Sequence, residues 1–138
     1  MSSVKTALTI AGSDPSGGAG IQSDLKTFSR LRVYGMAVIA ALTAQNTREV
    51  CSVAEVQPDF LERQLDAVLS DITPDAVKTG MLLRAAAVEV VAQKVHEYRV
   101  RNLVVDPVMI STSGATLLDP DALSVFRRVL LPDRKSVV

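Results

Sequence analysis

Short apolar runs alternate with segments of helical period along the chain, and this alternation predicts its fold class. Several runs are apolar at consecutive positions, as is typical of strands in a parallel sheet whose two faces are both covered by helices. The segments between them carry apolar residues three and four positions apart, which indicates helices with one buried face. The expected strands lie near residues 7–12, 36–44, 51–56, 75–81 and 102–109.

Helices are expected between and after these strands. The apolar spacing is clearest over 21–31 and 61–72, and a third helix is expected over about 85–98. A fourth begins at the sequence DPDAL, where Asp119 can cap the helix and Pro120 takes its first position. This order of strands and helices predicts an α/β fold.

Composition narrows the classes of function. The chain has 15 basic and 15 acidic side chains, so it lacks the cationic surface that attracts nucleic acids and anionic membranes. Cys51 is the only cysteine, which excludes an internal disulfide and fits a reducing cytosol. The N-terminus does not have the pattern of a secretion signal, and no apolar stretch is long enough to span a bilayer. We therefore expect a cytoplasmic protein in which residues 1–138 form one α/β domain that binds neither nucleic acid nor membrane.

A glycine-rich loop within the sequence TIAGSDPSGGAG, residues Thr9 to Gly20, follows the first expected strand. Its amides would lie at the positive end of the first helix, which suits an anion or the electron-rich edge of a ligand. A phosphate-binding loop starting at Gly12 would need lysine where Gly18 stands, and a dinucleotide loop starting at Gly18 meets Ser23 in place of its third small residue. A binding loop and a turn that needs positive φ angles remain the two alternatives.

Polar or exposed groups follow four of the expected strands. Because the carboxyl ends of parallel strands meet at one edge of a sheet, these groups are expected to converge on a small-molecule pocket. The alternative is that strand ends simply turn polar as they reach water. The four stretches are AGSD at 11–14, TAQN at 43–46, KTGM at 78–81 and DPVM at 106–109.

Four stretches in the same order along the chain carry a resemblance to a known family. They are TIAGSDPSGGAGIQSDLKTF, YGMAVIAALTAQNT, QLDAVLSDITPDAVKTGML and VVDPVMISTSGATLL. From about Ala7 to Pro132 the chain resembles the hydroxymethylpyrimidine and phosphomethylpyrimidine kinases of thiamine biosynthesis, which belong to the ribokinase-like superfamily. The resemblance implies a doubly wound, mostly parallel sheet flanked by helices. It also implies an enzyme that uses ATP and Mg²⁺ to phosphorylate 4-amino-5-hydroxymethyl-2-methylpyrimidine and then its monophosphate.

The resemblance also implies which residues bind the ligands. Asp24 and Gln45 would make the main polar contacts with the pyrimidine, while Asp106 would face the ATP phosphates and bind Mg²⁺, directly or through water. For Asp106, a helix-capping or turn role before Pro107 is the alternative. The residues implied to line the pyrimidine pocket are Gly12, Asp24, Gln45, Met81 and Val108.

Other polar residues are interpreted as structural. Lys78 stands at a strand end, where a phosphate contact is one interpretation and a solvated charge is the commoner one. The only histidine, His96, is expected to bond the last carbonyls of a helix. Ser13 and Ser16 lie outside a nucleophile-elbow motif and are expected to serve as polar groups of the loop.

Members of the family continue beyond the place where this chain stops. Val137 and Val138 resemble the start of a further strand, and the fold is expected to be truncated at its C-terminal side. The catalytic residues are unknown and expected beyond residue 138, so we expect little or no turnover by the isolated chain. An unpaired sheet edge would favour a homo-oligomer or aggregation. The alternatives are a non-catalytic pyrimidine-binding fragment and a pyridoxal or pyridoxine kinase.

Overall fold

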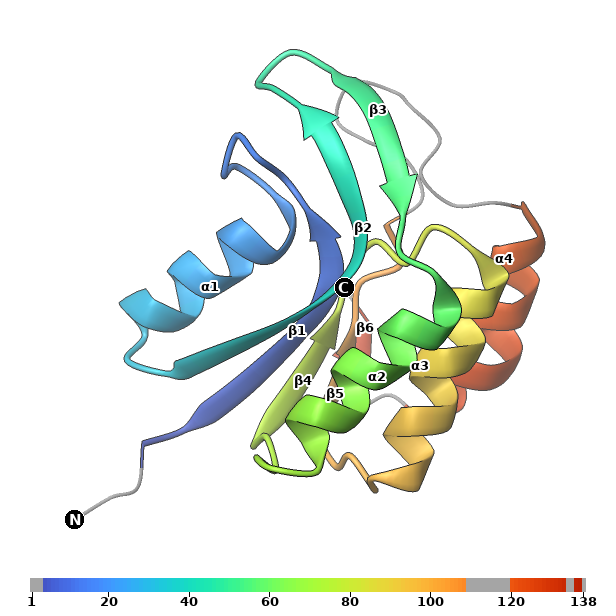
Figure 1. Cartoon of the computed structure of the whole chain (residues 1–138). Coiled ribbons are helices and arrows are strands. Elements are labelled where there is room, and N and C mark those ends of the chain that lie inside the picture. Colours follow the sequence, from blue (N-terminus) through green and yellow to red (C-terminus); the bar gives the residue numbers. More distant parts are fainter. Residues whose placement is uncertain (1–3, 109–119, 134–135, 138) are drawn as a thin grey trace.

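A twisted sheet of six described strands runs through the molecule, in the order β3-β2-β1-β4-β5-β6 (Figure 1). The structure is a computed structural model that describes residues 4–108, 120–133 and 136–137. The strands are β1 (Thr6–Ser13), β2 (Tyr34–Gln45), β3 (Val50–Glu55), β4 (Ala76–Thr79), β5 (Leu103–Val105) and β6 (Ser136–Val137). The helices are α1 (Gly20–Arg30), α2 (Pro58–Leu69), α3 (Ala85–Glu97) and α4 (Pro120–Val125), the last followed by a π-helical turn (Phe126–Leu130) and a 3-10 turn (Leu131–Asp133).

The sheet is doubly wound, as predicted. Strand β1 pairs in parallel with both β2 and β4, and the parallel pairing continues from β4 to β5 and from β5 to β6. Helix α1 covers one face of the sheet, whereas α2, α3 and α4 lie on the other (Figure 1). Strands are thus added on both sides of β1, with β2 and β3 on one side and β4, β5 and β6 on the other. This arrangement leaves a crevice at the carboxyl ends of β1 and β4, where ligands bind in open α/β sheets.

The core forms where the apolar runs predicted it. Strand β1 is buried over its central residues, and Leu8 and Ile10 belong to the main hydrophobic cluster. Helix α2 contributes Leu61, Leu65 and Leu69, which recur every four residues and are all buried. Burial on this scale stabilises the fold by about 1.5–3 kcal/mol for each large apolar side chain removed from water.

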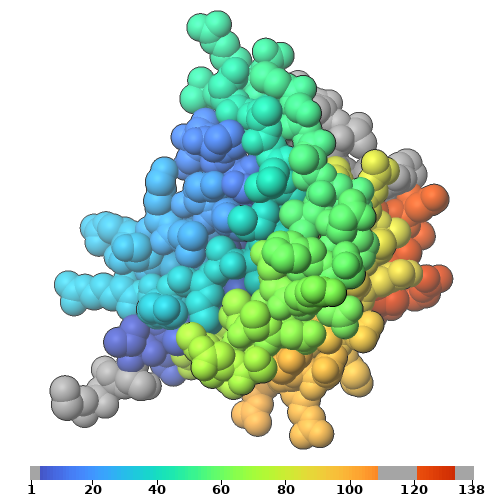
Figure 2. Space-filling view, in the orientation of Figure 1, coloured from blue at the N-terminus to red at the C-terminus, as the bar shows by residue number. Residues whose placement is uncertain are grey.

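Strand β3 departs from the alternation of buried strands and helices. It pairs antiparallel with β2 and is largely exposed, so the run at 51–56 is an edge strand rather than a covered one. The cause is the short connection from β2: Asn46 Oδ1 accepts hydrogen bonds from the amides of Arg48 (2.8 Å) and Glu49 (3.0 Å). Such a turn reverses the chain and can join only antiparallel strands. The β2–β3 hairpin projects beyond the rest of the molecule (Figure 2).

The expected C-terminal helix and strand are present where residues are described. Helix α4 begins at Pro120, as predicted, while its expected cap, Asp119, lies outside the described residues. Val137 belongs to β6, which pairs with β5, and Val138 lies outside the described residues. Every helix in the described ranges is too short or too polar to cross a bilayer.

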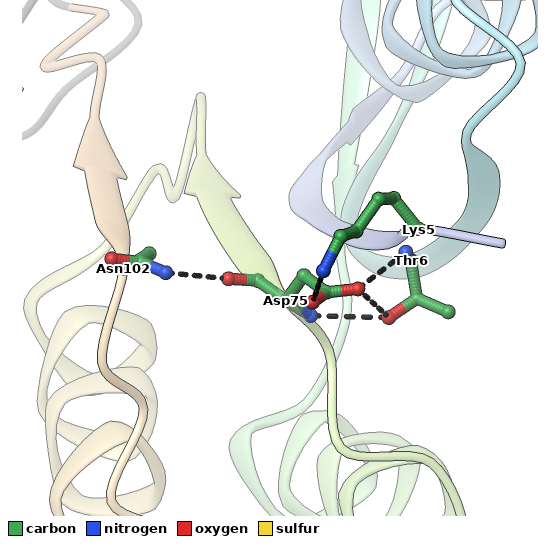
Figure 3. A network of polar contacts seen from close by, with 4 residues as sticks. All are labelled: Lys5, Thr6, Asp75 and Asn102. Atoms are coloured by element: carbon green, nitrogen blue, oxygen red, sulfur yellow. Dashed lines mark hydrogen bonds and ion pairs between the residues drawn. The ribbon is translucent and has the colours of Figure 1, made fainter. Parts of the chain in front are cut away.

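Asp75 ties together the amino ends of three strands (Figure 3). Its Oδ1 accepts from Lys5 Nζ at 2.8 Å, its Oδ2 accepts from the Thr6 amide at 2.9 Å, and its own amide donates to Thr6 Oγ1 at 3.0 Å. Asn102 Nδ2 donates to the Asp75 carbonyl at 2.8 Å. The hydrogen bonds from Lys5 and then from the Thr6 amide hold the pKa of Asp75 below its ordinary value. The network sets the register of β1, β4 and β5 at the end of the sheet opposite to the crevice.

Candidate functional site

A pocket of about 340 Å³ lies at the carboxyl ends of β1, β2, β4 and β5. The pocket lies where the strand order reverses, with β2 on one side of β1 and β4 on the other, as expected for a doubly wound sheet. All six residues that the resemblance assigned to ligand binding line it, and their individual roles stay predictions. The lining comprises Ala11, Gly12, Ser13, Asp14, Ala19, Gly20, Ser23, Asp24, Thr43, Gln45, Val50, Lys78, Gly80, Met81, Asp106 and Val108.

The amides of the glycine-rich loop are bonded to a carboxylate of the protein itself. Asp14 is only 3% exposed, and its Oδ1 accepts from the amide (2.8 Å) and hydroxyl (2.7 Å) of Ser16. Its Oδ2 accepts from the amides of Gly18 at 3.0 Å and Ala19 at 2.9 Å. These three amides therefore face an internal anion rather than a ligand, whereas the wider expectation that the loop suits an anion or an electron-rich ligand edge stays a prediction.

Asp14 is charged despite its burial. Burial alone would raise its pKa, but the hydrogen bonds from the Ser16 hydroxyl and amide, together with those from the loop amides, lower the pKa below 3.8. A carboxylate that accepts several such bonds is stabilised in its ionised form. Sequence reasoning missed this residue, although an aspartate that opens a Pro-Ser-Gly-Gly turn is a signal for local side-chain to backbone bonds.

Close packing explains two of the three glycines that line the pocket. Gly20 has φ +56°, and a Cβ built there would collide with the carbonyl oxygen of Gly12. At Gly12 itself, an added Cβ would stand 2.5 Å from Met81 Cε. The alternative of a turn with positive φ is therefore confirmed, and because this turn also lines the pocket, a binding role of the loop stays a prediction.

Asp24 and Lys78, which line the pocket, form a polar cluster with the buried Thr9. Thr9 on β1 is paired in register with Lys78 on β4, and Asp24 on α1 reaches both. Asp24 Oδ2 accepts from Thr9 Oγ1 at 2.6 Å and from Lys78 Nζ at 2.9 Å. Lys78 Nζ also lies 3.9 Å from Asp106 Oδ2. The interpretation of Lys78 as a solvated charge is therefore wrong, because its ammonium lies between two carboxylates.

Gln45 and an apolar wall complete the pocket. Thr43 Oγ1 lies 3.2 Å from Gln45 Oε1 and donates to the Ser13 carbonyl at 2.9 Å. Met81 is 9% exposed and packs in a small apolar cluster whose other members are Ala41, Val53, Leu83 and Val108. Polar groups at one side and an apolar surface at the other suit a flat heterocycle with hydrogen-bonding edges.

Asp106 does not form a metal site with the other described residues. Its carboxylate has the Lys78 ammonium as an ion-pair partner, and the described part of the chain contains no group of three or more His, Cys, Asp or Glu side chains that could hold a metal ion. Its backbone serves the turn before Pro107, because the Asp106 amide donates to the Thr79 carbonyl (3.0 Å) and the Val108 amide donates to the Asp106 carbonyl (2.9 Å). The structural alternative for this residue is therefore met, and its role toward Mg²⁺ stays a prediction.

Comparisons with known proteins show the family of this chain. The phosphomethylpyrimidine kinase family profile matches residues 14–138. The hydroxymethylpyrimidine/phosphomethylpyrimidine kinase of Escherichia coli (strain K12) is 56% identical over 126 residues, which are 91% of this chain and 47% of that protein. This chain thus spans about half the length of that curated relative.

Solved structures share the fold. The phosphomethylpyrimidine kinase of Clostridium difficile 630 superposes with a TM-score of 0.91 at 47% identity, over 96% of this chain and 58% of that one. The pyridoxal kinase of Staphylococcus aureus, in complex with AMP-PCP and pyridoxal, has a TM-score of 0.83 at 36% identity, over 98% of this chain and 47% of that one. The profile match, these similarities and the position of the pocket show that this chain belongs to the phosphomethylpyrimidine kinase family.

Proposed function

We propose that the protein phosphorylates 4-amino-5-hydroxymethyl-2-methylpyrimidine and its monophosphate in thiamine biosynthesis, and that this chain supplies the pyrimidine side of the site. Five residues implied to bind the pyrimidine come from five separate elements or their ends, and all of them line the pocket at the carboxyl ends of the strands. This convergence carries the proposal. The 56% identity to the Escherichia coli kinase also supports it.

In this proposal each group has a role suited to its chemistry. Asp24 accepts hydrogen bonds from the ring, Gln45 can both donate and accept, and Met81 packs against the ring face. Gly12 leaves room for the ring, and Val108 extends the apolar wall.

ATP is the proposed phosphate donor, and the AMP-PCP bound to the related pyridoxal kinase supports a nucleotide of this kind. Mg²⁺ would stabilise the charge on the transferred phosphate. Asp106 is the proposed contact for both, but the described residues do not complete a metal site, so the proposal assigns no step to the ion. A catalytic group outside residues 1–138, a cytoplasmic location and a single α/β domain over residues 1–138 belong to the same proposal.

Two measurements test the proposed function. The first is a calorimetric titration of the 138-residue chain with the aminopyrimidine, in which saturable binding is expected. The second uses a chimera in which this chain replaces the matching segment of the Escherichia coli relative. With ATP and Mg²⁺, mass spectrometry should detect a pyrimidine that has gained one phosphate group and then a second. A folded chimera that yields no phosphorylated pyrimidine, together with a chain that does not bind the ring, would contradict the proposal.

Phosphorylation of pyridoxal is the second candidate function. The TM-score of 0.83 with a pyridoxal kinase favours it, although the identity of 36% is lower than that with the pyrimidine kinases. Offering pyridoxal and the aminopyrimidine to the chimera in equal amounts decides between them. We expect the aminopyrimidine to be phosphorylated in preference.

A further inference from the structure

Among the described residues, hydrogen bonds reach only one oxygen of the Asp24 carboxylate. Oδ2 accepts from both Thr9 Oγ1 and Lys78 Nζ, whereas no described residue donates a hydrogen bond to Oδ1. The side chain is 16% exposed and lines the pocket. A carboxylate oxygen only accepts hydrogen bonds, so the remaining oxygen is matched to a ligand that carries an N–H or O–H donor.

Lys78 holds this carboxylate in place from the neighbouring strand. The parallel register of β1 and β4 sets Thr9 beside Lys78, so two donors approach the same oxygen from adjacent strands. The Lys78 side chain is 26% exposed, so most of its surface is shielded from water. A charge-assisted hydrogen bond of 2.9 Å in such surroundings restricts the carboxylate more than a solvated ion pair would.

Lys78 also separates two like charges. Its ammonium lies 2.9 Å from Asp24 Oδ2 and 3.9 Å from Asp106 Oδ2, so one positive charge serves two carboxylates at the same pocket. Without it, the two anions would repel each other, and Asp24 would be free to turn toward water or toward a cation.

We propose that Lys78 is a positioning residue for ligand recognition: it fixes Asp24 so that the free oxygen selects rings that carry an amino group. The inference rests on the proposed function, because it takes the ligand to be an aminopyrimidine. Lys78 need not touch the ligand for this role. Its effect is on the choice between ligands, which a contribution to stability alone would not alter.

The test compares two ligands by calorimetric titration of the full 138-residue chain. One is 4-amino-5-hydroxymethyl-2-methylpyrimidine, and the other is the same compound without its 4-amino group. The wild-type chain should prefer the amino compound by about tenfold, the order expected for one hydrogen bond to a charged group. Lys78→Met should lower this preference to about twofold or less, and Lys78→Arg should restore part of it. Thr9→Val, which removes the other donor to Oδ2, should lower the preference partially.

Lys5→Met is the matched control. Lys5 forms an ion pair of 2.8 Å with Asp75 at the opposite end of the sheet (Figure 3), so its loss should leave the ligand preference unchanged. If Lys78→Met keeps the wild-type preference, the inference is wrong. If that variant does not fold, as judged by circular dichroism, the same comparison is made with Lys78→Gln and Thr9→Val, and an unchanged preference in the folded variants overturns the inference.

A ligand-free measurement separates this inference from the proposed function. If the wild-type chain binds neither compound, the proposed function fails. The carboxylate ¹³C signal of Asp24 then tests whether the Lys78 ammonium holds Asp24 in place. At constant neutral pH this signal should move in Lys78→Gln or Lys78→Met and stay in place in Lys5→Met. A signal that does not respond to the loss of Lys78 would show that the ammonium does not hold Asp24, and the inference would be overturned.

Discussion

The end of the Met81 side chain lies over the bare Cα of Gly12, so near that a Cβ at residue 12 would stand 2.5 Å from Met81 Cε. Both residues line the pocket, and Met81 comes from the strand end beside that of Gly12. The atom in the way is the tip of a flexible side chain, which can move. Extra volume at residue 12 is therefore expected to change the pocket more than the fold.

Gly12→Ala should weaken binding of the aminopyrimidine by about 1–3 kcal/mol, because the displaced methyl group of Met81 enters the space of the ring. The melting temperature should fall only slightly. Gly18→Ala is the control, since residue 18 does not line the pocket and an added Cβ would come no nearer than 3.8 Å to Asp14 Oδ2. Equal affinities of Gly12→Ala and wild type in a calorimetric titration would show that residue 12 does not border the bound ligand.

Asp14→Ala should lower the free energy of unfolding by about 1–3 kcal/mol, because the amides of Ser16, Gly18 and Ala19 lose their acceptor. Urea denaturation measures the loss. Asp71→Ala removes the same charge from an exposed turn and should change stability by less than about 0.5 kcal/mol. A similar small effect for both variants would mean that the Asp14 bonds contribute nothing net to the fold.

The same carboxylate predicts how stability depends on pH. The pKa of Asp14 in the folded protein lies below the ordinary value of 3.8, so its charged form stabilises the native state above that value. This contribution is lost as the pH falls from about 5 through the folded-state pKa. Urea midpoints should therefore decline below about pH 5, and Asp14→Asn should decline less steeply than wild type. Parallel pH profiles for the two proteins would contradict the assignment.

The features of the fold that depend on local pattern were predictable. Apolar runs located the strands, the spacing of Leu61, Leu65 and Leu69 located α2, and Pro120 marked the start of α4. The hydrogen bonds of the Asp14 carboxylate reach no further than Ala19, so the local sequence was sufficient to predict them. The direction of β3 also follows from a local feature, the turn at Asn46.

The polar cluster of the site depends on contacts between distant parts of the chain. Lys78 is 54 residues from Asp24 and meets it only because β4 lies beside β1 in a particular register. A period of two along a strand tells which residues share a face, but it does not tell which residue of another strand stands alongside. Lysine at a strand end is usually solvated, and only the tertiary structure shows that this one is not.

The role of a second lysine, Lys94, was equally unpredictable from the sequence. Lys94 on α3 is 5% exposed, and its Nζ lies within 3.0 Å of Glu62, 2.8 Å of Asp66 and 3.0 Å of Glu97. Hydrogen bonding to Asp66 opposes the effect of burial and, with Glu62 and Glu97, raises the pKa of Lys94 above its ordinary value of 10.5. The stabilising charge is thus fully present at neutral pH and is lost only as the pH rises through the folded-state pKa.

Lys94→Met should lower the free energy of unfolding by about 1–2 kcal/mol, because three carboxylates between α2 and α3 lose their shared cation. The cost is moderate since these carboxylates are 41–50% exposed and stay hydrated. Their mutual repulsion is screened by salt, so 0.5 M NaCl, at a Debye length of roughly 4–5 Å, should recover more stability in Lys94→Met than in wild type. Lys5→Met, which removes an exposed lysine from a single carboxylate, should show no such recovery. An equal response of Lys94→Met and wild type to salt in urea denaturation would mean that the three carboxylates do not interact through Lys94.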